Sequence, residues 1–164
     1  MINFDLNNRV AIVTGGAQGF GLSITERFLK SGAKVIIWDI DEKTAKESIK
    51  KIGSENCFFQ KVDVNNFKEI ENNLKKVEEM HNKIDIFINN AGITGMNATI
   101  TDYPVEEWNK VINLNLTSTF LLSKHVIKKM LKNKNGKIVN ITSIVGHTGN
   151  IGQANYSASK AGLI

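Results

Sequence analysis

The sequence is poor in cysteine and proline, with one of each among its 164 residues. A single thiol excludes an intrachain disulfide, and Cys57, in the run Cys57-Phe58-Phe59, fits a buried small side chain in a reducing compartment. No apolar run approaches the roughly 18 residues that a membrane span needs. The first residues include Asp5 and no long apolar stretch, which argues against a secretory signal. We therefore expect a cytoplasmic protein without a membrane segment.

Metal-binding and nucleic-acid-binding patterns are also missing. The three histidines have no metal-ligand spacing, and no Cys/His/Asp cluster suggests a metal site. The net charge of +5 comes mostly from lysines scattered among Glu and Asn, which is typical of a solvated surface rather than of a nucleic-acid interface. One group is denser and would also suit an acidic partner protein: Lys128, Lys129, Lys132, Lys134 and Lys137.

Short apolar runs alternate with helical patterns along the whole chain. Such alternation predicts an α/β protein with a parallel sheet covered by helices on both faces. Asp102, followed by Pro104 and two glutamates, predicts a helix start with Asp102 as its capping residue. The expected strands are Val10 to Thr14, Lys34 to Trp38, Cys57 to Val62, Ile84 to Ile88 and Lys137 to Ile141.

A glycine-rich loop follows the first expected strand. It reads Thr14-Gly15-Gly16-Ala17-Gln18-Gly19-Phe20-Gly21. Glycines permit a tight turn and let backbone N–H groups approach a pyrophosphate at a helix N-terminus. An ordinary strand-to-helix turn would also use glycines, but in this context we interpret the loop as a cofactor-binding element.

Tyr156 and Lys160 stand four residues apart in a helix expected to start near Gln153. They therefore share one helix face, and an ammonium group so close to a phenol favours the phenolate. Such a tyrosine can give or take a proton near neutral pH. Most Tyr-x-x-x-Lys pairs are only solvated helix pairs, but Ser143, at an expected strand end, adds a second hydroxyl that can hold a carbonyl oxygen.

The segment from Ser143 to Lys160 resembles the active site of short-chain dehydrogenases/reductases, in which serine, tyrosine and lysine occur in this order. The run Gly149-Asn-Ile-Gly-Gln-Ala-Asn-Tyr-Ser-Ala-Ser-Lys160 is most similar to 3-oxoacyl-[acyl-carrier-protein] reductases. The resemblance implies a Rossmann-type doubly wound sheet. It also implies catalytic roles for Asn115, Ser143, Tyr156 and Lys160, with Asn115 holding a water on the proton path.

The resemblance also implies the cofactor contacts. Asp63 and Val64 match the positions that contact adenine, and Asn89-Asn90-Ala91-Gly92 matches a segment in which asparagine ties strands together beside the ribose. The full expected set is Thr14, Gly15, Gln18, Gly19, Phe20, Gly21, Asp39, Asp63, Val64, Asn89, Ala91, Gly92, Tyr156 and Lys160.

Asp39, at the end of the second expected strand, bears on the choice of cofactor. A carboxylate there can accept hydrogen bonds from the adenosine ribose and would repel a 2′-phosphate. Gln18, Trp38 and Ile40 offer no cation to such a phosphate. Asp39 thus favours NAD(H), with NADP(H) still possible, although the reductases that the sequence resembles mostly use NADPH.

The resemblance covers nearly the whole chain but does not cover the whole family domain. We expect residues 1–164 to form a single NAD(P)-binding Rossmann domain that is truncated after the fifth strand and incomplete at its C-terminus. An open outer edge on that strand is a pairing hazard. We therefore expect this piece alone to be loosely packed or poorly soluble, with little turnover.

The expected activity is hydride transfer between NAD(P)(H) and a carbonyl or alcohol. A 3-oxoacyl group on acyl carrier protein is the favoured substrate, with Lys128 and Lys129 as the proposed carrier contacts. Three alternatives remain open: an NAD-dependent polyol, sugar or hydroxyacyl dehydrogenase of the same family, another small-molecule carbonyl substrate, and a non-catalytic nucleotide-binding fragment. The family also implies a homo-oligomer, a tetramer.

Overall fold

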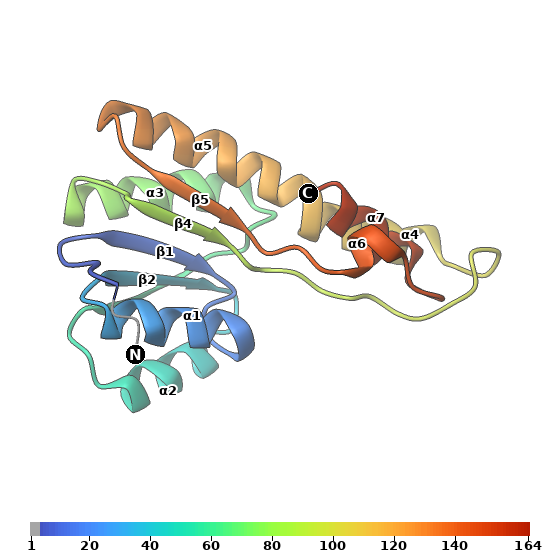
Figure 1. The fold of residues 1–164 in the computed structure, drawn as a ribbon, viewed down its shortest axis with the longest axis horizontal. Coiled ribbons are helices and arrows are strands. Elements are labelled where there is room, and N and C mark those ends of the chain that lie inside the picture. Colours follow the sequence, from blue (N-terminus) through green and yellow to red (C-terminus); the bar gives the residue numbers. More distant parts are fainter. Residues whose placement is uncertain (1–3) are drawn as a thin grey trace.

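A computed structural model describes residues 4–164, so the first three residues of the expected domain lie outside the described part. Strands and helices alternate along the described chain (Figure 1). The strands are β1 (Val10–Thr14), β2 (Lys34–Asp39), β3 (Cys57–Lys61), β4 (Ile86–Asn89) and β5 (Lys137–Asn140). The α-helices are α1 (Gly19–Lys30), α2 (Glu42–Ile52), α3 (Phe67–His81), α4 (Val105–Ile112), α5 (Ser118–Lys132), α6 (Val145–Thr148) and α7 (Ala154–Ala161), and a π-helical turn, η1 (Asn113–Thr117), joins α4 to α5.

All strand pairs in the sheet are parallel, in the order β3-β2-β1-β4-β5. The chain builds the sheet outward from β1 in one direction through β3 and then returns to add β4 and β5 on the other side. The order therefore reverses between β1 and β4, where a crevice opens outside the carboxyl ends of the strands. This arrangement confirms the predicted doubly wound α/β fold.

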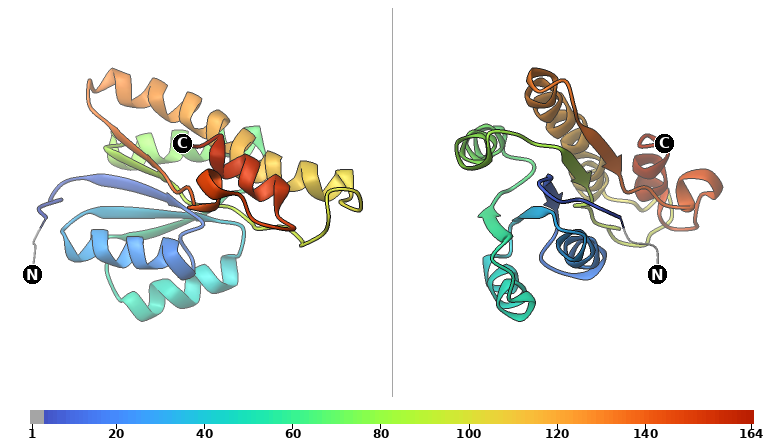
Figure 2. Two further views of the ribbon diagram at one scale, coloured as in Figure 1. Left: turned by 45° about the vertical axis from the view of Figure 1, so that its right-hand side comes forward. Right: turned by 60° about the vertical axis from the view of Figure 1, so that its left-hand side comes forward.

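Strands β1, β2 and β4 are buried on both faces, which explains why they are almost continuously apolar. Helices α1 and α2 lie on one face, and α3 and α5 lie on the other (Figure 2). Side chains of β1 alternate between the two: Ala11 and Val13 pack toward α1, whereas Ile12 packs toward α3 and α5. This period of two fixes the register of the central strand between two helix layers.

The boundaries of β4 and α4 differ from those predicted. Strand β4 begins two residues later than expected, at Ile86, because Ile84 and Asp85 belong to the approach to the strand. The predicted cap of α4 is wrong: Pro104 occupies the cap position, and Asp102 instead accepts a hydrogen bond from Thr99 Oγ1 at 2.5 Å. The carboxylate of Asp102 is bound by the hydroxyl group of Thr99 in the preceding turn and does not cap the N–H groups of α4.

Strand β5 forms one edge of the sheet in the described chain. Its side chains are mostly exposed, and Val139 keeps 46% of its surface accessible. The nearby outer face of α5 also exposes Phe120, Ile127 and Leu131. No helix among residues 4–164 combines the length and apolar character that crossing a bilayer requires.

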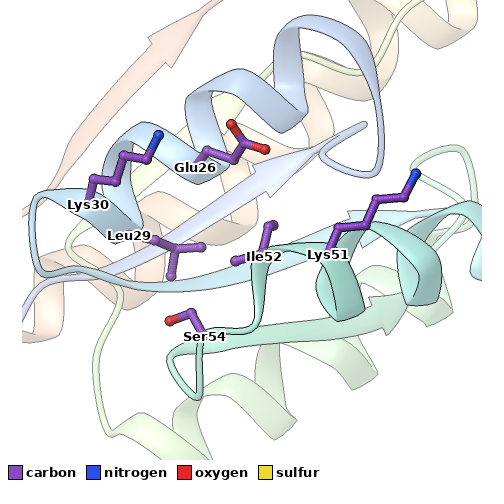
Figure 3. A pocket seen from close by; sticks show the side chains of 6 residues that line it. All are labelled: Glu26, Leu29, Lys30, Lys51, Ile52 and Ser54. Atoms are coloured by element: carbon purple, nitrogen blue, oxygen red, sulfur yellow. The ribbon is translucent and has the colours of Figure 1, made fainter.

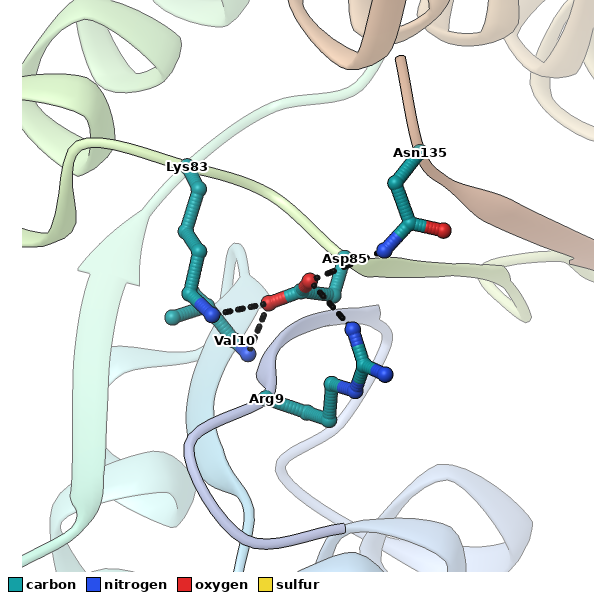
Figure 4. Close-up of polar contacts among 5 residues, drawn as sticks. All are labelled: Arg9, Val10, Lys83, Asp85 and Asn135. Carbon is teal, nitrogen blue, oxygen red and sulfur yellow. Dashed lines mark hydrogen bonds and ion pairs between the residues drawn. The ribbon is translucent and has the colours of Figure 1, made fainter. Parts of the chain in front are cut away.

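Asp85 lies at the amino-terminal ends of the central strands, and its carboxylate joins several chain segments there (Figure 4). Its carboxylate, 7% exposed, accepts hydrogen bonds from Arg9 Nη1 (3.1 Å), the Val10 backbone N–H (2.9 Å) and Asn135 Nδ2 (3.4 Å). Lys83 Nζ lies 3.1 Å away. The side chain thus links the residues that lead into β1, β4 and β5.

Asp85→Ala should lower the free energy of unfolding by about 2 kcal/mol, because it leaves the buried Val10 N–H without its acceptor and removes the partner of two partly exposed cations, Arg9 and Lys83. Urea unfolding would measure the loss, with the exposed Glu55→Ala as a control expected to change little.

Burial by itself raises the pKa of Asp85, but the hydrogen bonds from Val10, Lys83 and Arg9 outweigh it and leave the pKa below the ordinary 3.8. The charged carboxylate therefore stabilises the fold above pH 4, and this contribution fades as the pH falls through the lowered folded-state pKa. Asp85→Asn should lack that acid-dependent loss; an unchanged acid limb would contradict the assignment.

Candidate active site

The glycine loop turns the chain from β1 into α1. Gly15 and Gly19 have φ angles of +62° and +55°, which favour glycine, and the Gly15 N–H donates to the Trp38 carbonyl at 2.7 Å. Gln18 provides no side-chain cap for α1, and the first turn holds no acidic residue. The free N–H groups at this helix N-terminus therefore remain available to a phosphate group.

Gly21 packs so closely against the backbone of Gly15 that a side chain does not fit. A β-carbon at this position would lie 2.1 Å from the Gly15 carbonyl oxygen and 2.6 Å from Asn90 Nδ2. The first distance is impossible without a shift of the loop backbone, and the second would force the Asn90 side chain to move. The sequence pattern thus corresponds to a physical requirement that the first turn of α1 fold directly back on the glycine loop.

A hollow of about 650 Å³ opens beside this loop at the carboxyl ends of the strands. Nine of the expected cofactor residues line it: Gly15, Gln18, Phe20, Gly21, Asp39, Asp63, Val64, Ala91 and Gly92. Sequence reasoning did not assign eight other lining residues to the site: Trp38, Ile40, Asp41, Val62, Asn65, Asn90, Ile93 and Leu114. Most of these eight residues are sequence neighbours of a predicted residue at a strand end. That adjacency is the sequence signal by which they could have been assigned to the site.

The charged residues that line the hollow are all acidic. Its lining includes Asp39, Asp41 and Asp63, and no lysine or arginine. Asp39 is partly exposed and accepts hydrogen bonds from the backbone N–H groups of Ala17 and Asp41, each at 3.1 Å. A hydrogen bond from the Thr44 side chain lowers the pKa of Asp41, aided by the Thr44 N–H, and keeps that second carboxylate charged.

Thr14, Gly19 and Asn89 do not line the hollow. Thr14 is buried and supports it from behind: its Oγ1 donates to the Ile88 carbonyl at 3.1 Å and accepts from the N–H groups of Asn90 and Ala91, each at 3.0 Å. Asn89 Nδ2 donates to Asn140 Oδ1 at 2.8 Å and so ties β4 to β5. Its neighbour Asn90 faces the loop instead and donates to the carbonyls of Thr14 and Gly15.

Helix α7 brings Tyr156 and Lys160 together. The Lys160 Nζ lies 5.7 Å from the centroid of the Tyr156 ring and donates to the Ile141 carbonyl at 2.7 Å. Only 5% of Lys160 is exposed, and this burial lowers the pKa of its ammonium group. The half-buried Tyr156 stays accessible to a ligand.

The pair adjoins the glycine-loop hollow through Gly92. A β-carbon on this lining residue would lie 3.7 Å from Lys160 Nζ and 3.0 Å from Asn115 Oδ1. A larger side chain here would therefore separate the hollow from the lysine. Gly92 and Lys160, which are far apart in sequence, therefore lie side by side at the wall of the hollow.

Ser143 lies between β5 and α6, in a segment that packs against α7. It is half-buried, and its Oγ accepts only a weak contact from the Val145 N–H at 3.5 Å. The neighbouring Thr142 Oγ1 donates to the Lys160 carbonyl at 2.7 Å, and Gly146 permits the close approach, since a β-carbon there would lie 2.8 Å from the Lys160 carbonyl carbon. The Ser143 Oγ has no acceptor among residues 4–164, so its hydroxyl can donate to a bound group.

Asn115 lies in η1, a wider helical turn that sequence periodicity did not reveal. π-Helical turns occur frequently at functional sites. Asn115 is 1% exposed and clamps Ile93: its Oδ1 accepts from the Ile93 N–H, and its Nδ2 donates to the Ile93 carbonyl, each at 2.9 Å. The π-turn therefore positions an amide directly behind the wall of the hollow.

Two other features lie away from this centre. A hollow of about 380 Å³ separates the C-terminal ends of α1 and α2, where Leu29 and Ile52 face each other between Lys30 and Lys51 (Figure 3). Cations there complement the negative ends of the two helix dipoles, which accounts for both lysines. Within residues 4–164, no cluster of three or more His, Cys, Asp or Glu side chains could hold a metal, and burial raises the pKa of the Cys57 thiol to about 11.

A parallel sheet with a glycine loop, a crevice at its switch point and a Tyr–Lys pair beside that crevice defines a Rossmann-type α/β domain. The chain belongs to the short chain dehydrogenase family, which it matches over residues 9–164. It is 40% identical to the 3-oxoacyl-[acyl-carrier-protein] reductase FabG of Chlamydia pneumoniae, over 99% of this chain and 66% of that protein. For the Vibrio cholerae reductase of the same name, identity is 41% over 98% of this chain and 65% of that protein.

Solved structures give the same result for the fold. The crystal structure of gox2181 superposes with a TM-score of 0.93 at 37% identity, over 96% of this chain and 63% of that one. An NAD⁺-bound xylitol dehydrogenase superposes with a TM-score of 0.89 at 30% identity, over 95% of this chain and 61% of that one. The chain thus spans about two thirds or less of the length of these relatives.

Proposed function

We propose that this chain carries the cofactor-binding and proton-transfer machinery of an NAD(P)-dependent carbonyl reductase that acts on a 3-oxoacyl group held by acyl carrier protein. The observation that carries the proposal is the contact between Lys160 and Tyr156 at the wall of the glycine-loop hollow. The 40–41% identity to two such reductases supports the substrate class. The protein's residence in the cytoplasm and a tetrameric assembly also remain proposals.

The residues present fit a dinucleotide. The N–H groups of α1 would hold the pyrophosphate, Asp39 the adenosine ribose, and Asp63 and Val64 the adenine. When bound, the nicotinamide supplies the hydride that reduces the carbonyl carbon. The acidic lining supports NAD(H) over NADP(H), because a 2′-phosphate beside Asp39 and Asp41 would meet two negative charges and no cation.

In the reducing direction, Tyr156 donates a proton to the substrate oxygen. Ser143 donates a hydrogen bond that holds the same oxygen, and Lys160, which lies beside the Tyr156 ring, orients the ribose. Asn115 supports the proton path from Lys160 toward solvent. These side chains come from the connection between β5 and α6, from η1 and from α7.

Among the clustered lysines, Lys128 is the better candidate for a carrier-protein contact. Lys129 and Lys132 both engage Glu78, which occupies their charges. Lys128 is exposed on the same helix and forms no ion pair within residues 4–164. Its ammonium group can therefore meet an acidic partner without giving up an internal contact.

The cofactor choice is tested by the affinities for NADH and NADPH of the full gene product and of its Asp39→Asn variant. We expect the parent to bind NADH more tightly. The variant keeps the shape of the side chain but loses a charged acceptor, so NADH should weaken about tenfold while NADPH gains. Asp5→Asn, an exposed residue near the N-terminus, is the control. A parent preference for NADPH would overturn the use made of Asp39.

The NAD⁺-bound neighbour supports a second candidate, an NAD-dependent polyol dehydrogenase. Turnover of a 3-oxoacyl thioester with NADH, compared with oxidation of xylitol with NAD⁺, separates the two. Activity on the thioester alone would support the reductase, and activity on the polyol alone would replace it. Cofactor binding without either turnover would favour a nucleotide-binding module.

A further inference from the structure

Ser159 immediately precedes Lys160 on α7, and none of its surface is exposed. Its Oγ donates to the Tyr156 carbonyl at 2.8 Å and accepts from Asn115 Nδ2 at 3.0 Å. One hydroxyl thus uses its donor within the turn that carries Tyr156 and its acceptor on another element. A buried hydroxyl with both functions satisfied costs little to bury and fixes the geometry around it.

The partner of Ser159 is equally committed. Both N–H groups of the Asn115 amide are used, one on the Ile93 carbonyl at 2.9 Å and one on Ser159. Its Oδ1 accepts from the Ile93 N–H, so the side chain cannot rotate without breaking three hydrogen bonds. Asn115 therefore transmits the position of the hollow's wall to α7.

These contacts form a continuous hydrogen-bonded chain from Ile93, at the cofactor hollow, through Asn115 and Ser159 to the turn that bears Tyr156 and Lys160. We propose that Ser159 is a positioning residue that sets the proton-donating phenol relative to the bound cofactor. This inference rests on the proposed function. The side chain of Asn115 acts through Ser159, which does not line the hollow.

The same helix offers a matched control. Ser157 Oγ is also buried, yet it has no hydrogen-bond partner in the described chain. Ser157→Ala and Ser159→Ala remove the same atom from the same short helix, and both replace serine by a better helix former. A difference between them therefore reports the hydrogen bonds of Ser159 rather than helix propensity or the loss of a buried oxygen.

In the full gene product, Ser159→Ala should lower kcat about tenfold, because a misplaced proton donor slows the chemical step. The dissociation constant for NADH should stay within about threefold, since the glycine loop is untouched. Ser157→Ala should change both by less than about twofold. Equal kcat values in the two variants, or a loss confined to cofactor binding, would overturn the proposal.

Amide hydrogen exchange supplies a readout that needs no turnover. Without Ser159, Asn115 loses one of its anchors, so the Ile93 N–H should exchange several-fold faster than in the parent, and it should not change in Ser157→Ala. Unchanged exchange at Ile93 would contradict the proposed chain even if the protein had another activity. Conversely, absent NADH binding by the parent would remove the proposed function, while exchange would still test the contact.

Discussion

Tyr156→Phe in the full gene product should lower kcat by a factor of about 10²–10⁴, because the variant retains the ring but has no proton to give. The affinity for NADH should change by less than about twofold, since no glycine-loop contact is altered. Steady-state turnover of a 3-oxoacyl thioester and fluorescence titration with NADH would separate the two effects.

The other tyrosine provides the control. Tyr103 donates its hydroxyl to the Met96 carbonyl at 2.8 Å, in the loop that leads to α4. Tyr103→Phe should therefore lower stability modestly and leave most of the turnover intact. Full activity in Tyr156→Phe would remove the proton-donor role, and with it the main mechanistic argument for Ser143 and Lys160.

Gly21→Ala should produce the second large effect, a loss of NADH affinity of at least about 100-fold. The added methyl group would lie 2.1 Å from the Gly15 carbonyl oxygen, so the glycine loop and the first turn of α1 must separate. Overpacking against backbone cannot be relieved by a side-chain rotation, and it should also destabilise the protein by about 1–3 kcal/mol. Calorimetric titration with NADH and thermal unfolding would measure both consequences.

Gly53→Ala separates this steric effect from ordinary backbone strain. Gly53 ends α2 with φ at +64°, but a β-carbon there would meet no atom within 4 Å. It should therefore cost about 1–2 kcal/mol of stability and leave NADH affinity unchanged. Similar affinities in the Gly21 and Gly53 variants would show that close packing of the loop is not required for binding.

Local pattern was sufficient to predict the parallel sheet and to propose where the site lies. Each strand is a short apolar run between polar or glycine-containing segments, and the observed β1 has the predicted boundaries. The carboxyl ends of parallel strands meet at one edge, so Gly15, Asp39, Asp63 and Gly92 had to come together once the order of elements was known. Tyr156 and Lys160 are close because helical geometry alone places them on one face.

Features that depend on tertiary contacts were not predictable in this way. Of two adjacent asparagines, Asn90 lines the hollow while Asn89 bonds Asn140, a choice made by where β4 stops. The predicted cap Asp102 bonds Thr99 instead, and Lys129 is occupied by Glu78 across two helices. Asn115 was predicted as a site residue. Neither its π-helical backbone nor its hydrogen bond to Ser159 has a signal in the spacing of apolar residues.

The π-turn also constrains how this protein can vary. A π-turn corresponds to one extra residue in an otherwise α-helical ladder, and η1 carries this residue between α4 and α5. Deleting one residue there would let a regular α-helix run from α4 into α5, but it would remove the wide turn that carries Asn115. Asn115 would then lose the position from which it forms both hydrogen bonds with Ile93. Length changes in this chain are therefore tolerated far less at Asn113–Thr117 than in its loops.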